Sequence, residues 1–348
     1  MKRNVKRGAK EVVPAKAKGK MPKVTDVSAE DSREQTLETG RKFKYPLHVP
    51  LQKILINAAI IFGIVLVVFS GFSWWMLYKV QDTGDFFYTA TRIVPIPVAS
   101  VDGKLVRYGD YMRRVRASIF YLEQQENRDL TTEDGRRELE FTRRHNMDET
   151  LRVALARQIA SENHLSISEE EIDANIQATL DAGTGGSISA KAYESSLRRY
   201  FGWSMDDYRH IVRDRLLLRR VSFAIDSAAR TKITDIKNQL NVGGDFAELA
   251  KQFSDDVATK EGGGVASAVS IKNVDQDGLI AAAKVLSPGQ ISDVIEGVDA
   301  FFVIKLIEKT ESTVKYALIK VNLHELNKRF EQLGQDGLIT EFIKIQSE

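Results

Sequence analysis

Residues 244–264, GDFAELAKQFSDDVATKEGGG, decide how the C-terminal half of this chain is interpreted. Phe246, Leu249, Ala250 and Phe253 recur at helical spacing and predict one buried helix face. The three glycines that end the stretch fit a phosphate-binding loop, a simple helix stop or part of a larger pattern. A phosphate loop is excluded because no strand leads into the glycines and no Gly-Lys-Ser/Thr follows. A helix stop, with glycine supplying a positive φ, leaves the flanking sequence unexplained.

Two further blocks follow in order. Residues 285–296, VLSPGQISDVIE, contain a Ser-Pro-Gly turn in which proline presets φ. Residues 301–309, FFVIKLIEK, predict a strand. Together with the first stretch, the three blocks resemble the signature of a parvulin-type peptidyl-prolyl isomerase domain.

The strand that normally opens a parvulin domain is missing upstream of Gly244, where residues 207–236 predict helix. A strand predicted at Val314–Val321 follows the strand at Phe302–Glu308 after a short turn. In parvulins the first and last strands lie side by side and antiparallel. The resemblance therefore implies a circularly permuted domain over residues 226–321, with Val314–Val321 antiparallel to Phe302–Glu308 and central in its sheet.

The resemblance also implies positions for the isomerase pocket. The family's two histidines fall on Tyr316 and Phe302, and its Cys/Asp position falls on Asp256, which together form the expected catalytic set. The wall that grips the proline ring falls on three further residues: Leu279, Lys284 and Asp275. Most of these residue types differ from those of the family, so the pocket is predicted to be degenerate. Asp256 as a helix-end cap and Tyr316 as a packing residue are the alternative interpretations.

The residue inventory narrows the chemistry further. The chain has no cysteine, which excludes a disulfide framework, a thiol nucleophile and a thiolate metal site. None of its five histidines falls on a pocket position, and no metal-binding spacing or nucleophile elbow is present. We therefore expect no metal and no cofactor.

A membrane anchor is predicted at residues 54–78, ILINAAIIFGIVLVVFSGFSWWMLY, which are 25 residues without a charge. About 20 apolar residues are enough to cross a bilayer as helix, whereas the apolar part of a signal peptide is shorter. Residues 1–53 hold 14 Lys and Arg against 6 Asp and Glu. Since basic residues favour the cytoplasmic side, we expect a disordered cytoplasmic tail over 1–53 and an extracytoplasmic body.

The region after the span divides into a linker at 79–94 and a mostly helical domain at 95–225. A hairpin is expected around Asp102-Gly103, and helices are expected to begin at Ser168 and Ser204, each with an acid three residues on. The hairpin and helices resemble the N-terminal domain of the SurA/PrsA/PpiD-type foldases. In that arrangement a C-terminal segment, here 322–348, packs on the N-terminal domain. A frayed tail is the alternative. Two helical stripes are predicted in this segment, the second spanning 338–343.

The expected fold class is α+β: one transmembrane helix, a mostly helical SurA-like domain, and a small antiparallel sheet with helices. The expected function is that of a single-pass, membrane-anchored foldase or chaperone outside the cytoplasm. Its partners would be unfolded or partly folded exported polypeptides and, through residues 54–78, the lipid bilayer; no nucleic acid is expected. An active peptidyl-prolyl isomerase and a non-enzymatic scaffold for one partner protein are the alternatives.

Overall fold

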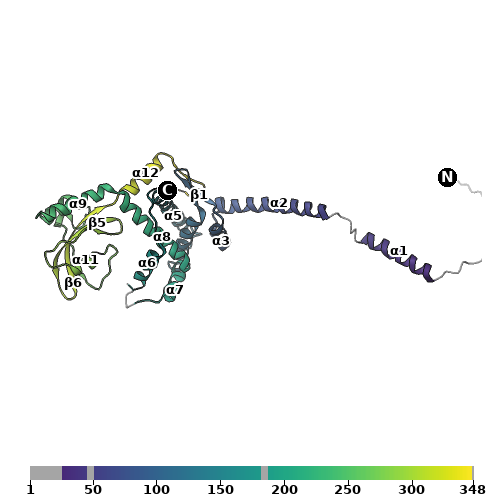
Figure 1. The fold of residues 1–348 in the computed structure, drawn as a ribbon, viewed down its shortest axis with the longest axis horizontal. Helices are drawn as coiled ribbons and strands as arrows, with labels where there is room; N and C mark the ends of the chain where they lie inside the picture. Colours follow the sequence, from purple (N-terminus) through teal and green to yellow (C-terminus); the bar gives the residue numbers. More distant parts are fainter. Residues whose placement is uncertain (1–25, 45–50, 182–186, 347–348) are drawn as a thin grey trace, which may run out of the picture. The chain divides into compact units, whose positions relative to one another are not determined.

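The computed structural model describes residues 26–44, 51–181 and 187–346, in two units, Met1–Phe72 and Ser73–Glu348 (Figure 1). In the first unit, helix α1 (Asp26–Lys44) lies within the tail predicted to be disordered, so that prediction is wrong for these residues. Its Glu, Gln and Arg residues at 30–39 are strong helix formers. Residues 1–25 and 45–50 of the predicted tail lie outside the described residues.

Helix α2 (Leu51–Trp75) begins in the first unit and contains most of the predicted span. It continues into a π-helical turn at Met76–Val80, and Gln81 ends it in the left-handed region with φ 56°. The resulting stretch, Leu51–Val80, is long and apolar enough to cross a membrane by length and composition.

The helical domain of the second unit follows directly. Its elements are α3 (Asp85–Ile93), β1 (Pro97–Val101), β2 (Lys104–Arg107), α4 (Tyr108–Gln124), α5 (Glu133–Glu162), α6 (Glu169–Asp181), α7 (Ala190–Phe201) and α8 (Met205–Ile225). The predicted hairpin is confirmed by the pairing of β1 with β2, and both predicted helix starts carry their capping boxes. The linker predicted at 79–94 is wrong for α3, because Phe87 and Thr91 bury one side of that helix.

The C-terminal segment returns to this domain as α12 (Glu325–Gln335) and β7 (Ile339–Glu341). The second helical stripe predicted there is wrong. Gly337 turns the chain at φ 69°, and β7 then pairs antiparallel with β1 to give the sheet order β2-β1-β7. Pairing with β7 satisfies N–H and C=O groups that would otherwise be unpaired on the edge of β1. Ile343 and Ile345 are buried in the same core as β1.

The Asp226 carboxylate lies where the two halves of the second unit meet. The helix predicted through residue 236 breaks at Asp226, where α9 (Ser227–Asn241) begins. One oxygen of Asp226 accepts a hydrogen bond from the Ala229 amide at 2.9 Å. The other accepts from the amides of His324 and Glu325 at 2.7 and 3.0 Å. Asp226 thus satisfies backbone donors at the starts of α9 and α12.

The second domain is built around a four-stranded antiparallel sheet of order β3-β6-β5-β4. After α9, its elements are α10 (Phe246–Phe253), a 3₁₀ turn (Lys260–Gly262), β3 (Val269–Ser270), α11 (Leu279–Val285), β4 (Ile295–Glu296), β5 (Ala300–Lys309) and β6 (Thr313–Asn322). Strands β5 and β6 pair along their length and are the two central strands. The predicted pairing and central place of Val314–Val321 are confirmed.

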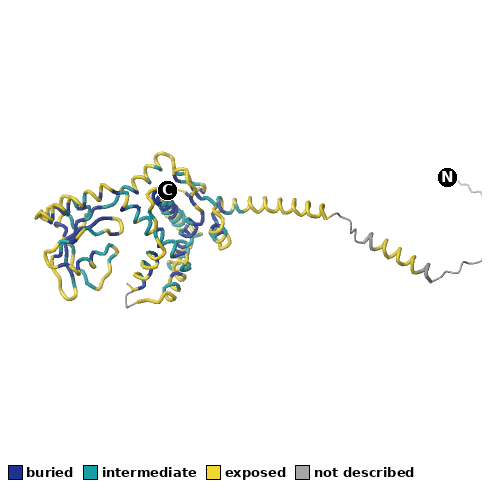
Figure 2. Tube along the Cα trace, in the orientation of Figure 1, coloured by how far each residue is buried: buried dark blue, intermediate teal, exposed yellow. Residues whose placement is uncertain are grey.

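Side chains alternate between the two faces of this sheet, as strand geometry requires. Phe301 and Val303 of β5 pack with α9 and α10. Phe302 and Ile304 face the other way and pack with α11. Figure 2 shows β5 and β6 as buried segments between their exposed surroundings. The fold is therefore α+β, with helices on both faces of the small sheet.

Two of the three glycines at residues 262–264 are needed because the chain passes too close to α10 and β6 for a side chain. Gly264 has φ 84°, and a Cβ on it would lie 2.4 Å from the Leu318 carbonyl oxygen. The Leu318 amide donates to the Gly264 oxygen at 2.8 Å. Gly263, at φ 70°, would bring a Cβ within 2.6 Å of the Ala247 Cβ. Only glycine lets this segment run between α10 and the backbone of β6.

Candidate functional site

Three of the predicted pocket residues share one buried cluster. Phe302 on β5, Tyr316 on β6 and Leu279 on α11 are all buried on the α11 side of the sheet. Their neighbours in the cluster are apolar: Ile280, Ala283, Leu286, Ala300, Ile304, Leu306, Val314 and Leu318. Because side chains fill the space between α11 and the sheet, this face is organised as packed core.

The strand register separates the two positions expected to replace the paired histidines. Tyr316 lies opposite Leu306, whereas Phe302 lies opposite Lys320. Four residues of strand separate the two positions, which corresponds to about 13 Å at the rise of a β-strand. The Lys320 ammonium lies 5.8 Å from the centre of the Phe302 ring and 3.7 Å from an Asp299 oxygen. Phe302 and Tyr316 are therefore not cross-strand neighbours.

Acidic residues surround the Tyr316 end of the cluster. Burial, with the negative charges of Asp275 and Asp277, raises the pKa of Tyr316 and keeps its hydroxyl neutral. Asp275 accepts hydrogen bonds from the amides of Leu279 and Ile280 at 2.6 and 3.0 Å. The Asp275 carboxylate thereby stabilises the start of α11, where such a negative charge is favourable.

Asp256 and Lys284 lie apart from that cluster. Asp256 accepts from the amide of Thr259 at 3.1 Å and from its hydroxyl, which fixes the turn after α10. Lys284 is exposed on the last turn of α11, and its carbonyl oxygen accepts from the Lys309 ammonium. Of the six predicted pocket residues, the structure brings together Phe302, Tyr316, Leu279 and Asp275, although their polar groups do not converge.

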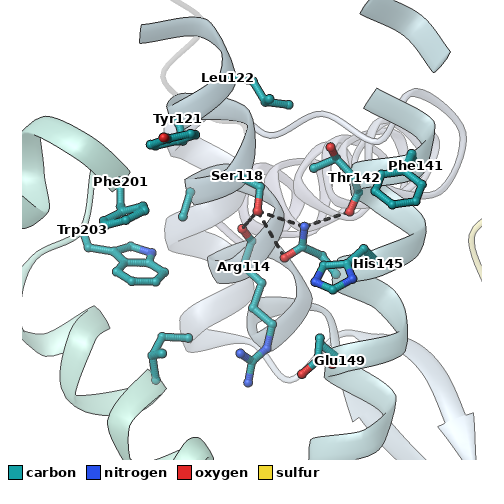
Figure 3. Close-up of a pocket in the computed structure, with 13 residues that line it drawn as sticks. Arg114, Ser118, Tyr121, Leu122, Phe141, Thr142, His145, Glu149, Phe201 and Trp203 are labelled. Carbon is teal, nitrogen blue, oxygen red and sulfur yellow. Dashed lines mark hydrogen bonds between the residues drawn. The ribbon is translucent and has the colours of Figure 1, made fainter. Parts of the chain in front are cut away.

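An open groove lies in the helical domain instead, between α4, α5 and the segment that joins α7 to α8. Its volume is about 400 Å³. Figure 3 shows Tyr121, Phe201 and Trp203 along one side and Phe141 and His145 along the other. We call this the aromatic groove; its lining is Arg114, Ala117, Ser118, Tyr121, Leu122, Phe141, Thr142, His145, Asn146, Glu149, Phe201, Trp203 and Ile211.

The aromatic side of the groove is fixed by the end of α7. Gly202, at φ 67°, closes that helix: its amide donates to the Arg198 oxygen, and the Trp203 amide donates to the Leu197 oxygen. The bond from the Gly202 amide to the Arg198 oxygen is that of the αL capping motif, which needs a left-handed residue at this point. The rings of Phe201 and Trp203 then stack with centroids 5.0 Å apart, and Phe201 also stacks on Tyr121 at 6.0 Å.

Polar side chains of α4 and α5 bind one another within the lining of the groove. The Asn146 amide nitrogen donates to the Ser118 hydroxyl at 3.0 Å and to the Thr142 carbonyl at 2.8 Å (Figure 3). Phe141, by contrast, is 69% exposed at the rim. A lining that combines polar groups with exposed aromatic rings suits an extended polypeptide with apolar side chains.

Buried ion pairs hold the helices that form the groove. Asp214 on α8 binds Arg114 on α4 at 2.7 Å and Arg157 on α5 at 2.6 Å. Arg157 also pairs with Asp110, and Arg113 lies 3.4 Å from an oxygen of both Asp110 and Asp207. We call Asp110, Arg113, Arg114, Arg157, Asp207 and Asp214 the charge network. It joins α4, α5 and α8, because Asp214 binds a residue on each of the other two helices and Arg157 does the same.

The charge network shifts the pKa values of its acids. Burial alone would raise the pKa of Asp110, but the attraction and hydrogen bond of Arg157, followed by the charge of Arg113, hold it below its ordinary value of 3.8. Burial also favours a higher pKa at Asp207, but hydrogen bonds from Tyr88 and Ser204 hold that pKa below its ordinary value. For Tyr88, burial and then the bond to Asp207 raise the pKa to about 12.

Sequence reasoning missed the groove because its residues come from four separated segments. The one local signal was residues 200–204, YFGWS, where three aromatic residues flank a glycine just before a helix start. Lys320 was missed for another reason: its place opposite Phe302 depends on the strand register, which the sequence alone left open.

Comparison with known proteins finds two family matches along the chain. Residues 52–222 match a SurA-like N-terminal domain, and residues 218–308 match a PPIC-type PPIase domain. The second match begins within α8 and continues through α9, and strand β6 lies beyond its C-terminal end. The chain thus contains a SurA-like N-terminal domain and a PPIC-type parvulin domain.

Its relatives are foldases and chaperones by name. "Foldase protein PrsA" of Clostridium kluyveri is 33% identical over 110 residues, which are 31% of this chain and 32% of that protein. "Chaperone SurA" of Thiobacillus denitrificans is 26% identical over 188 residues, covering 51% of this chain and 38% of the relative. The chain thus spans about a third of the length of the curated relatives that it matches.

Among solved structures, a PrsA peptidylprolyl isomerase from Bacillus anthracis aligns at 17% identity with a TM-score of 0.18. The alignment covers 53% of this chain and 87% of the Bacillus anthracis chain. PrsA from Streptococcus pneumoniae aligns at 19% identity with a TM-score of 0.19, covering 70% and 86%.

Proposed function

We propose that this chain is a single-pass, membrane-anchored foldase or chaperone that handles unfolded exported polypeptides outside the cytoplasm and whose proline-isomerase pocket is degenerate. The names of its PrsA and SurA relatives support the foldase or chaperone activity. The apolar helix at Leu51–Val80 and the basic residues before it support the anchor and its orientation.

The observation that carries the degenerate pocket is the separation of its polar positions. Isomerisation needs polar groups that act on one twisted amide, whose rotational barrier is about 18–20 kcal/mol. Tyr316 and Phe302 lie opposite different partners, and Asp256 binds its own turn. Losing several orienting contacts together is expected to remove most of the rate, since each 1.36 kcal/mol is about tenfold.

The permutation is part of the same proposal. Strand β6 takes the central place beside β5 that the opening strand has in parvulins. The domain boundaries we propose are a tail at 1–53, a span at 54–78, a connection at 79–94, a SurA-like domain at 95–225, a permuted parvulin-like domain at 226–321 and a C-terminal segment at 322–348.

We assign client binding to the aromatic groove. Its occupant is an extended segment of unfolded polypeptide whose apolar side chains contact the rings of Tyr121, Phe141 and Phe201. Aromatic walls provide a large apolar contact area with few rotatable bonds, which favours binding without a fixed sequence.

The test is to measure both activities on the purified full chain in nanodiscs. We expect little acceleration of Xaa-Pro peptide isomerisation and a clear slowing of the aggregation of an unfolded client. Isomerase turnover comparable to that of an ordinary parvulin, abolished by Asp256→Ala, would establish the enzyme alternative instead. Failure to slow aggregation of any client, with binding of one specific protein, would establish the scaffold alternative.

Orientation in the membrane is tested separately. Protease added outside spheroplasts should digest the residues after about position 80 and spare the tail, as the positive-inside rule predicts. Protection of the second unit would contradict the proposed topology.

A further inference from the structure

The end of the apolar helix is built into the core of the second unit. Leu77 is only 2% exposed, and the Tyr108 hydroxyl donates to the Leu77 carbonyl oxygen at 2.7 Å. The Tyr78 hydroxyl donates to the Pro97 carbonyl oxygen at 2.5 Å, and the side-chain Nε2 of Gln81 donates to the Lys344 carbonyl oxygen at 2.8 Å. These contacts make the last turn of this helix part of the helical domain.

The length of the uncharged stretch places this turn close to the edge of a bilayer. Residues 54–78 span about 37 Å as helix, against about 30 Å for the hydrocarbon core. Leu77 therefore lies within about one helical turn of the hydrocarbon boundary. The polar layer on each side of a bilayer is some 5–7 Å thick, so the protein packed around Leu77 lies in or beside the headgroups.

Helix α3 begins only four residues after this turn and has one apolar exposed side. Phe86 is 60% exposed and Ile93 is 78% exposed; seven residues apart, they lie on the same helix face, and Val94 follows at 51%. Phe87 and Thr91 occupy the opposite, buried side.

The charges next to this face are paired within the protein. Asp85 binds Arg116 at 2.6 Å, and Arg92 binds Asp206 at 2.6 Å. An exposed apolar face with neutralised neighbours, held close to the hydrocarbon boundary by a short connection, matches the properties of an interfacial helix.

We propose that α3 lies in the headgroup layer of the extracytoplasmic leaflet, with Phe86, Ile93 and Val94 directed toward the acyl chains. The proposal rests on the membrane anchor proposed above. Together with the buried turn at Leu77, this second contact fixes the height of the helical domain above the lipid, because a domain held at two points cannot rotate freely about its anchor.

The absence of natural cysteine allows a direct test on the full chain. Phe86→Cys and Ile93→Cys are labelled with an environment-sensitive fluorophore and reconstituted in phosphatidylcholine and phosphatidylglycerol vesicles containing lipids spin-labelled near the headgroup. The matched control is Val257→Cys, an 89% exposed apolar position in the sheet domain. Val65→Cys lies near the middle of the apolar helix and reports insertion of the anchor, in matched vesicles whose lipids are spin-labelled at the end of the acyl chain.

We expect blue-shifted emission and strong lipid quenching at positions 86 and 93, and water-like emission without quenching at 257. If the label at 65 is quenched while those at 86 and 93 behave like 257, the anchor stands and the lipid contact of α3 is refuted. Labels at 86 and 93 that are shielded from water but not quenched by lipid would show that protein covers the face, which also overturns the proposal. No quenching at 65 would refute the anchor itself.

Discussion

Replacement of Gly264 by alanine tests the close approach that holds the glycine segment against β6. The new Cβ would lie 2.4 Å from the Leu318 oxygen and 3.2 Å from the Ala250 Cβ. The matched control is Gly289→Ala, because Gly289 has nearly the same φ, 86° against 84°, but no heavy atom within 4 Å of its new Cβ. Both substitutions carry the same backbone strain, and only the first adds a clash.

The magnitudes follow from these two differences. Left-handed backbone costs an alanine roughly 1–2 kcal/mol, so this is the expected effect of Gly289→Ala. Gly264→Ala adds overpacking of about 1–3 kcal/mol. Weakening of the 2.8 Å bond from the Leu318 amide adds about 1 kcal/mol more. We therefore expect Gly264→Ala to destabilise the sheet domain by about 2–4 kcal/mol more than its control.

Native-state hydrogen exchange, followed by mass spectrometry on peptides from β5 and β6, measures this difference in the full chain. Since about 1.4 kcal/mol is tenfold in an equilibrium constant, β6 amides should exchange at least roughly 30-fold faster in Gly264→Ala than in Gly289→Ala. Equal rates in the two variants would refute the argument that β6 requires glycine at 264 for space as well as for φ.

Three other predictions concern the helical domain. The pKa of Asp110 is lower in the folded state than its ordinary value of 3.8, so the Asp110 charge stabilises the domain above that value, and this stability is lost as the pH falls through the folded pKa. Asp110→Asn should therefore flatten the acid side of a pH–stability profile measured by Trp fluorescence. An unchanged profile would contradict the charge network. Ile343→Ala should destabilise the domain by about 2–5 kcal/mol in urea titrations because it removes buried side chain from the core, whereas Lys344→Ala, at an exposed position, should not. Phe141→Ser should weaken the slowing of client aggregation without changing the urea midpoint, in contrast to Val257→Ser; equal aggregation curves for the two variants would remove the groove from the client site.

The sequence by itself determined the features that depend on neighbouring residues. The 25 uncharged residues at 54–78 predicted the apolar helix because crossing a bilayer depends on length and polarity alone. The serines at 168 and 204 predicted helix starts because a capping box is complete within four residues. The hairpin at Asp102-Gly103 and the antiparallel pair of β5 and β6 followed from short turns between two strand patterns.

Only the tertiary structure decided the features that depend on contacts between distant segments. Residues 338–343 have an apolar spacing that suits a helix, but the open edge of β1, more than 230 residues earlier, made residues Ile339–Glu341 a strand. The register of β6 placed Lys320 opposite Phe302 and left Tyr316 opposite Leu306, and so separated the pocket positions that an alignment of motifs brings together. A strand pattern repeats every two residues, so it specifies which face a side chain occupies without specifying which residue lies across from it.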